Sequence, residues 1–252
     1  MERRLTHVNW MEIETRLGAG ESRVLLPVGS LEAHGFIAQG TDILAPEYLC
    51  GRLAEPLKAW IAPCIPYGIT RSLSAYPGTV HVEPGPFTAY LAEVLRSFAR
   101  QGLREILVLN GHGGHTAALR ETAGEVHVQT GARLAVVDWW SECYDLCVQH
   151  LGVPGGHAGA DEAAMLSAAA PGLVREDLKA RVRGWVGRPS TATFPVPGSL
   201  LSGQPEGLTV VTDEARCRAY VEAGVERLRD VYLKILQGWE PLEDAGASGA
   251  GR

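Results

Sequence analysis

Short apolar runs and stretches of helical periodicity alternate along most of the chain. The run "RVLLPVG", Arg23 to Gly29, consists mainly of branched apolar residues and ends at a glycine, which is typical of a buried strand. "EILVLNGHGG" from Glu105 and "RLAVVDWW" from Arg133 have the same form, whereas "IAPCIPYG" from Ile61 predicts an edge or irregular strand because it contains two prolines. Helical spacing is found between these runs, over Asp42–Trp60, Pro84–Gln101 and Thr116–Val128.

This order of strands and helices predicts the fold class. Strand, helix and strand at such spacing require crossover connections, which produce an α/β fold with a mainly parallel sheet and helices on both faces. No internal repeat or linker divides the chain, so we expect residues 1–240 to form a single domain. Gly184–Leu208, rich in Gly, Pro, Ser and Thr, predicts a long surface excursion. Thr212–Trp239 predicts a closing helix, and residues 241–252 a disordered tail.

Composition and charge narrow the range of partners. Apolar residues make up 46% and charged residues 21%, the balance of a folded globular protein. The formal charge of −6 argues against nucleic acid or an anionic membrane as a partner. "MERRLTHVNW" lacks the apolar core of a signal peptide and no apolar run is long enough to span a bilayer, so we expect a cytoplasmic location. The odd number of cysteines fits a reducing compartment. Cys143 and Cys147 are four residues apart, so they are either a buried pair on one helix face or part of a metal site.

Three potential metal ligands lie close together after the first expected strand. "GSLEAHGFIAQGTD" places Glu32, His34 and Asp42 among glycines and small residues, where they stabilise neither a core nor a helix. Imidazole nitrogen and carboxylate oxygen are the donors that zinc and manganese-like ions take, and one Asp can bridge two ions. The segment therefore indicates a metal-binding loop. An isolated Glu-x-His pattern would more often be a solvated Glu32 followed by a His34 that caps a turn.

Two further expected strands end in polar residues of the same kinds. His112 follows "EILVLNG", and Asp138 closes "RLAVVD". Ligands of parallel sheets bind outside the carboxyl ends of the strands, so these residues should meet Glu32 and His34 at one edge of the sheet. Taken alone, "NGHGG" fits equally well a turn that binds an anion at the start of a helix.

A third cluster, "GGHAGADE", precedes an apolar helical stretch and contains His157, Asp161 and Glu162. Carboxylates at this position favour a helix N-terminus through the helix dipole, and we adopt that interpretation for Asp161. His157 and Glu162 are interpreted as functional because of the following resemblance.

In combination, "LPVGSLEAHG…GTD", "PGT", "LVLNGHGG" and "HAGADE" resemble the motifs of the creatininase family of metal-dependent amidohydrolases. Their order and spacing cover roughly Leu26 to Met165. The resemblance implies a three-layer α/β/α sandwich with a mainly parallel central sheet, usually assembled into hexamers or related homo-oligomers. It also implies a divalent metal cofactor, with one or two ions of Zn, Mn or Fe per subunit.

The resemblance further implies roles for individual residues. Four side chains match metal ligands, with the Asp as the bridge: Glu32, His34, Asp42 and His112. His157 matches a histidine that handles protons near the substrate, and Glu162 matches a carboxylate at or beside the metals. Four residues in or beside the motifs are expected to contact the substrate: Ser72, Gly113, His115 and Asp138.

The chain also departs from the family pattern. The interval from Glu32 to Asp42 is one residue shorter than in typical members, and it contains "FIAQ" in place of Pro-His-Leu-Pro. In "NGHGGH", His115 replaces the usual Asn. Members that process creatinine carry Tyr-Glu where this chain has Gly113 and Gly114, and that Glu holds one metal. Glu162 is therefore the leading substitute ligand, and creatinine is not the expected substrate.

Together these features predict a metal-dependent amidohydrolase that cleaves a C–N bond of a small cyclic or linear amide. Bound divalent ions lower the pKa of water and so supply hydroxide near neutral pH. His157 or Glu162 would carry the proton to the leaving nitrogen. A peptidase of the mycofactocin-maturation type and a keto-inositol C–C hydrolase are alternatives within the family. There are two non-enzyme alternatives: a nucleotide- or phosphate-binding regulatory domain, and a scaffold subunit. The regulatory domain is disfavoured because the sequence contains neither Gly-x-Gly-x-x-Gly nor a phosphate-loop Lys-Ser/Thr.

Overall fold

The structure is a computed structural model that describes residues 1–188 and 190–249, with side chains up to residue 240. At its centre is a parallel four-stranded sheet in the order β2–β1–β3–β4. The strands are β1 (Arg23–Val28), β2 (Trp60–Ile61), β3 (Glu105–Asn110) and β4 (Arg133–Asp138). The expected edge strand is only two residues long, because the prolines of "IAPCIPYG" have no N–H to donate to the ladder.

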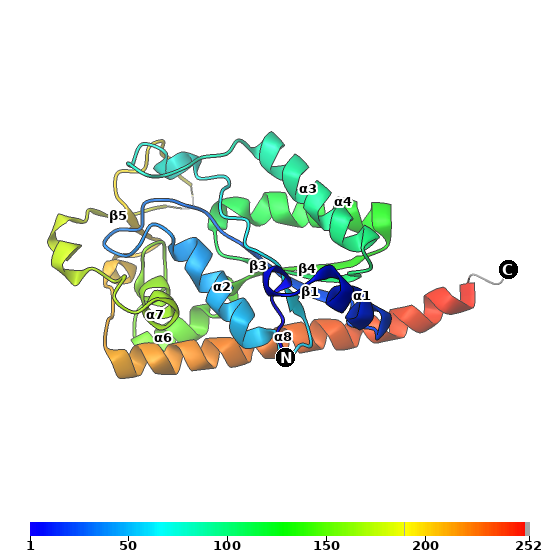
Figure 1. Ribbon diagram of the computed structural model, residues 1–252. Coiled ribbons are helices and arrows are strands. Elements are labelled where there is room, and N and C mark those ends of the chain that lie inside the picture. Colours follow the sequence, from blue (N-terminus) through cyan, green and yellow to red (C-terminus); the bar gives the residue numbers. More distant parts are fainter. Residues whose placement is uncertain (189, 250–252) are drawn as a thin grey trace.

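Helices cover both faces of this sheet and produce the expected three-layer α/β/α sandwich (Figure 1). Alternate residues of β1 point to opposite faces: Val24 packs with one helical layer, and Leu25 packs with the other. The first layer contains α1 (Trp10–Gly18), α3 (Pro84–Arg100) and α4 (Thr116–Thr130). The second contains α2 (Thr41–Leu53), α5 (Trp139–Glu142), α6 (Tyr144–Leu151), α7 (Ala160–Ala169) and α8 (Glu214–Gly249). Because α5 begins at Trp139, the strand expected over "RLAVVDWW" ends two residues early.

The long helix α8 runs along one face of the molecule (Figure 1). The hydroxyl of its buried Tyr232 donates to the backbone carbonyl of Val108 in β3, which fixes the helix to the sheet. The backbone of residues 241–249 continues this helix, and residues 250–252, the rest of the expected tail, lie outside the described residues. Across the described part of the chain, no helix combines the length and apolar character needed to cross a membrane.

The expected surface excursion over Gly184–Leu208 has buried anchors. It contains β5 (Gly184–Val186) and β6 (Leu200–Ser202), which form a parallel two-stranded sheet in which Leu200 and Ser202 are buried. The amide of Leu201 donates to the carbonyl of His157 over 2.8 Å, so this segment is attached beside a candidate catalytic residue. A composition rich in Gly, Pro, Ser and Thr does not reveal these contacts.

Two glycines allow the start of α2 to pack against the strand ends. Gly29 follows β1 and Gly111 follows β3, and a Cβ at either position would overlap the backbone carbonyl of Asp42. Pro46 lies inside α2 and has no N–H, so it cannot donate to that carbonyl as an ordinary helical residue would. The glycines in "VGS" and "NGH" are thus required for close approach, and this approach brings the Asp42 side chain between the two strand-end loops.

Candidate metal centre

Six candidate side chains converge at the carboxyl edge of the sheet. The register of β1 and β3 pairs Val28 with Asn110, so the loops that follow the two strands leave the sheet at the same level. The first turn of α2 and the turn that enters α7 approach the same place. Three overlapping groups of possible ligand atoms result, each with its atoms within 4.8 Å of one another: Glu32–His34–His157, Glu32–Asp42–His112 and His34–Asp42–Glu162.

Asp42 stands between two imidazoles and offers one oxygen to each. Its Oδ1 lies 2.9 Å from His34 Nε2, and its Oδ2 lies 3.0 Å from His112 Nδ1. The hydroxyl of Ser30 donates to Oδ2 over 2.8 Å and helps to fix the carboxylate plane. Because each oxygen faces a different imidazole, Asp42 has the arrangement expected of a bridge between two cations.

Two glutamates complete the groups. Glu32 is 1% exposed, and neither of its carboxylate oxygens has a hydrogen-bond partner among the described residues, although His112 Nδ1 lies 3.1 Å from Oε1. Glu162 Oε2 lies 3.4 Å from His34 Nε2 and accepts a 2.6 Å hydrogen bond from the amide of Ala158. A buried carboxylate with no donor carries a large desolvation cost, which a bound cation would offset.

The three histidines of the site are oriented in the same way. Each directs its outer nitrogen to a backbone carbonyl: His34 Nδ1 to Glu32 over 3.0 Å, His112 Nε2 to Ile69 over 2.8 Å, and His157 Nε2 to Ala33 over 2.7 Å. A carbonyl only accepts, so these outer nitrogens carry the proton. The inner nitrogen of each neutral ring therefore presents a lone pair to the carboxylates.

This donor set fits divalent cations. A lone pair that faces a carboxylate oxygen at about 3 Å is repelled unless a proton or a cation lies between them. Imidazole nitrogens with a backbone acceptor on the opposite nitrogen, combined with carboxylates, are the usual surroundings of zinc and related ions. The unpartnered oxygens of Glu32 and the two-sided contacts of Asp42 therefore fit one or two ions of this kind.

Electrostatics within the protein alone favour protons at the same positions. Burial disfavours the imidazolium of His34, but Asp42 and Glu162 outweigh it and raise the pKa of His34 to about 10. Neighbouring carboxylates likewise raise the pKa of His112 well above its usual range against the effect of burial, and the two histidines hold the pKa of Asp42 well below its usual range. Burial raises the pKa of Glu162 well above its usual value. The site is thus built to hold positive charge.

The turn before α7 orients His157 and Glu162 together. Ala158 has a left-handed backbone conformation, with φ of 56°, which is unusual for a residue with a side chain. Its amide is thereby directed to the Glu162 carboxylate, and His157 projects toward Glu32, with Nδ1 3.4 Å from Oε1. Burial and the charge of His34 lower the pKa of His157 to about 4, so this imidazole is neutral at pH 7.

His115 lies behind the site. It is buried, stacks on Phe87 with ring centroids 4.6 Å apart, and accepts a 3.0 Å hydrogen bond at Nε2 from the amide of Ile69. The carbonyl of the same Ile69 accepts from His112, so His115 braces the residue that orients a candidate ligand. Burial lowers the pKa of His115 to about 3. In contrast to our expectation of substrate contact, its contacts are those of a positioning residue.

The other three expected substrate contacts differ in their location. Ser72 and Gly113 line the cavity next to the candidate ligands. Asp138 is buried and accepts hydrogen bonds from Asn110, Thr116 and Arg120, and it is not among the lining residues. It fixes Asn110 at the end of β3, and the Asn110 side chain in turn accepts from the amide of His112.

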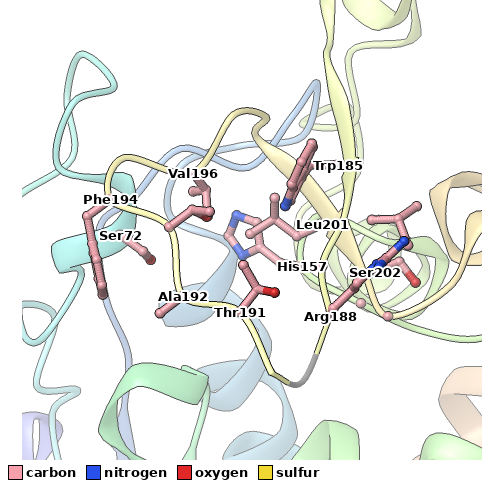
Figure 2. A pocket seen from close by; sticks show the side chains of 15 residues that line it. Ser72, His157, Trp185, Arg188, Thr191, Ala192, Phe194, Val196, Leu201 and Ser202 are labelled. Atoms are coloured by element: carbon pink, nitrogen blue, oxygen red, sulfur yellow. The ribbon is translucent and has the colours of Figure 1, made fainter.

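Two adjoining cavities open onto the site. The inner cavity, about 260 Å³, is lined by the carboxylates Glu32, Asp42, Asp161 and Glu162 and by His112 and His157, among others. The outer cavity, about 850 Å³, is formed mainly by residues of the 185–203 segment. Both are lined by Ser72, Gly156, His157 and Leu201, so they adjoin each other at these residues. Figure 2 shows His157 at the centre of the outer cavity, between Thr191, Val196 and Leu201.

Several lining residues were not anticipated from the sequence. Asp161 lines the inner cavity and accepts from the amide of Gly156, and burial raises its pKa to about 6. Trp140 lines it as well, and "DWW" beside a strand end was a usable signal for this residue. Leu201 and the outer cavity had no such signal. Cys143 and Cys147 are buried in the core and belong to none of the candidate ligand groups among the described residues.

Fold and site together define a class: a three-layer α/β/α protein with a candidate site for two divalent cations at the carboxyl edge of its sheet. The creatininase family, described as creatinine amidohydrolase, matches residues 6–228. The chain therefore belongs to the creatininase family of hydrolases, which confirms the resemblance seen in its motifs.

Two relatives and two solved structures illustrate the similarity. Creatinine amidohydrolase of Pseudomonas putida is 31% identical over 193 residues, 68% of this chain and 73% of that protein. Mycofactocin precursor peptide peptidase of Mycobacterium ulcerans (strain Agy99) is 31% identical over 166 residues, 61% of each protein. A creatininase structure with Mn has a TM-score of 0.78 at 25% identity and covers 92% of this chain and 97% of that one. A mutant creatininase of Zn–Zn type has the same TM-score and coverage at 24% identity.

Proposed function

We propose that this protein is a metal-dependent amidohydrolase that cleaves a C–N bond of a small cyclic or linear amide. The observation that carries the proposal is the arrangement around Asp42, with one carboxylate oxygen on each of two imidazoles and the unpartnered oxygens of Glu32 beside them. Five side chains would hold the cations: Glu32, His34, Asp42, His112 and Glu162. Zn or Mn is favoured because similar creatininase structures are of Zn–Zn type or contain Mn, and Fe accepts the same kinds of ligand.

When bound, divalent ions in such a site activate water and polarise a carbonyl oxygen. The protein supplies the remaining functions. His157 lines both cavities and is neutral at pH 7, so its Nδ1 is available to take a proton while Nε2 stays bound to the Ala33 carbonyl. In the proposed reaction His157, together with Glu162, passes that proton to the leaving nitrogen.

Creatinine is not the substrate that we propose. In the creatinine-processing pattern a Glu ligand occupies the position of Gly114. Here a Cβ at Gly114 would overlap the Ile69 carbonyl and the His112 ring, so this backbone has no room for any side chain. Glu162, already 3.4 Å from His34 Nε2, takes the vacant ligand role in the proposal.

A peptidase is the second candidate. The similarity to mycofactocin precursor peptide peptidase covers 61% of this chain, and the outer cavity offers more room than a small ring amide requires. A phosphate-binding regulatory domain is disfavoured, since four carboxylates line the inner cavity and would repel an anion. By resemblance to the family we also propose a homo-oligomer, hexameric or related, which light scattering after size exclusion would test.

The decisive experiment combines elemental analysis with kinetics on ring amides, formamides and short peptides, with Mn or Zn added. We expect stoichiometric metal in the purified protein and turnover that is lost on chelation and restored by metal. Glu32→Gln should remove metal and turnover, whereas Glu125→Gln, the same change on an exposed side chain of α4, should alter neither. Full activity of a metal-free preparation would refute the proposal.

A further inference from the structure

The outer cavity differs in chemistry from the site it adjoins. Its lining residues include Trp185, Val186, Phe194, Val196 and Leu201, whose side chains are apolar, and no carboxylate of the described residues is among them. The inner cavity, in contrast, is lined by four carboxylates. Because His157 and Ser72 line both cavities, we infer that one molecule can extend from one to the other, with its reacting bond in the inner cavity and an apolar part in the outer one.

Arg188 gives the outer cavity a positive charge. It lines the cavity, and no ion pair or side-chain hydrogen bond joins it to another described residue. Figure 2 shows Arg188 and Phe194 on opposite sides of His157. A guanidinium is permanently charged and forms paired hydrogen bonds with a carboxylate, so this side chain is suited to an anionic group at the far end of a substrate.

The walls of the outer cavity are held by hydrogen bonds to the site. The amide of Val196 donates to the Ser72 carbonyl over 3.1 Å, and the Val196 carbonyl accepts from the Tyr76 hydroxyl over 3.0 Å. On the other side, Leu201 pairs with His157, and β6 pairs with β5, which carries Trp185. The cavity is therefore a built extension of the site and is anchored to residues that line the inner cavity.

We propose that the outer cavity selects linear amides that carry an apolar side chain and a carboxylate beyond the bond to be cleaved, with Arg188 binding that carboxylate. This inference rests on the proposed amidohydrolase function and specifies its substrate class. An 850 Å³ space is far larger than a small ring amide needs, and it lies in the range of cavities that hold extended ligands. The charge of Arg188 and the lack of opposing carboxylates favour an anion over a neutral or cationic end group.

Matched substrates that differ in one group test the proposal. N-formyl-L-phenylalanine and N-formylglycyl-L-phenylalanine are compared with the corresponding 2-phenylethylamine derivatives, which lack only the carboxylate. With the metal-loaded protein, we expect kcat/KM to be roughly tenfold higher for at least one carboxylate form, mainly through KM, since the guanidinium is exposed. Arg188→Gln should remove this preference by raising KM for the carboxylate forms. Arg183→Gln, the same change on an exposed residue that does not line the cavity, is the control.

A binding measurement separates this inference from the proposed function. Quenching of tryptophan fluorescence by 3-phenylpropionate, taken as the difference between the parent protein and Trp185→Phe, reports occupancy of the outer cavity without turnover. Quenching that weakens roughly tenfold in Arg188→Gln and not in Arg183→Gln supports the anion site, even if no amide is hydrolysed and the proposed function fails. Equal binding by both variants, or equal turnover of both members of each substrate pair, overturns the inference and leaves the metal centre unaffected.

Discussion

The inner and outer cavities meet at His157 but are formed by different kinds of structural element. Strand ends and helix starts form the inner cavity, and its ligands are almost fully buried: Glu32 and His34 are each 1% exposed and Asp42 is 2% exposed. The outer cavity is made by a segment without long elements, and its Phe194 is 67% exposed. The side chains proposed to bind the metals are thus held in tightly packed surroundings. The residues proposed to select the substrate belong to a more exposed segment. Changes to the ligands of the inner cavity should alter metal binding, and changes in the 185–203 segment should alter selectivity alone.

The largest effect is expected from Asp42→Asn. The amide retains the shape and the Ser30 contact but removes the negative charge between His34 and His112. A two-ion clamp supplies several kcal/mol, so turnover should fall roughly 1,000-fold or more. Elemental analysis should show loss of both ions. Asp177→Asn, an exposed change in the same residue type, should retain full metal content, and an Asp42→Asn protein that keeps two ions would contradict the bridging role.

His157→Ala should separate proton transfer from metal binding. Its Nδ1 is 3.4 Å from Glu32, but the Asp42-centred groups are complete without it. We expect the metal content to be retained and kcat to fall by about 100- to 10,000-fold, with little change in KM. Metal analysis and steady-state kinetics on one preparation measure both quantities. Loss of metal in this variant would make His157 a ligand.

His115→Phe tests the bracing of His112 through Ile69. The phenyl ring keeps the stacking on Phe87 and removes only the acceptor for the Ile69 amide. Supporting residues of this kind change metal affinity by about 10- to 100-fold, and we expect a loss at the lower end. Competition with a chromophoric chelator gives the affinity, and thermal unfolding of the metal-free protein shows whether folding is preserved. His150→Phe, away from both cavities, is the control; unchanged affinity in His115→Phe would remove the bracing role.

The smallest effect concerns proton release on metal binding. Without metal, the raised pKa of His34, about 10, and that of His112 keep protons on these rings at pH 7 to 8. A cation must displace them, so its affinity should rise as the pH increases toward 10 and fall as the pH decreases. Calorimetry in buffers of different ionisation enthalpy should report net release of protons. Zero release at pH 7.5 would show that the metal-free site is already deprotonated.

The fold could be predicted from the sequence because its signals are local. The apolar runs of β1 and β3 and the periodic stretches of α3 and α4 identify buried strands and amphipathic helices within a few residues. The exceptions have physical reasons. Prolines shorten the edge strand at β2, and Trp139 is apolar enough to resemble a strand continuation although it begins α5.

The site was only partly predictable. Motif spacing indicated which residues reach the sheet edge, and the structure brings Glu32, Asp42 and His112 together there. Motif spacing does not indicate which way a side chain points. His115 and Asp138, which hydrogen-bond to neighbouring protein groups, could therefore not be distinguished from Ser72 and Gly113, which line the inner cavity.

The outer cavity could not be predicted at all. It depends on long-range backbone pairing, such as that of Leu201 with His157, and no local pattern of residues encodes this pairing.

Crystals grown with Mn²⁺ and measured at an energy that gives anomalous scattering from manganese would locate the cations around Asp42. We expect two peaks beside Asp42, one near each carboxylate oxygen, with His34 and Glu162 around one peak and Glu32 and His112 around the other. A crystal saturated with manganese that shows no anomalous density between these side chains would contradict a two-cation site.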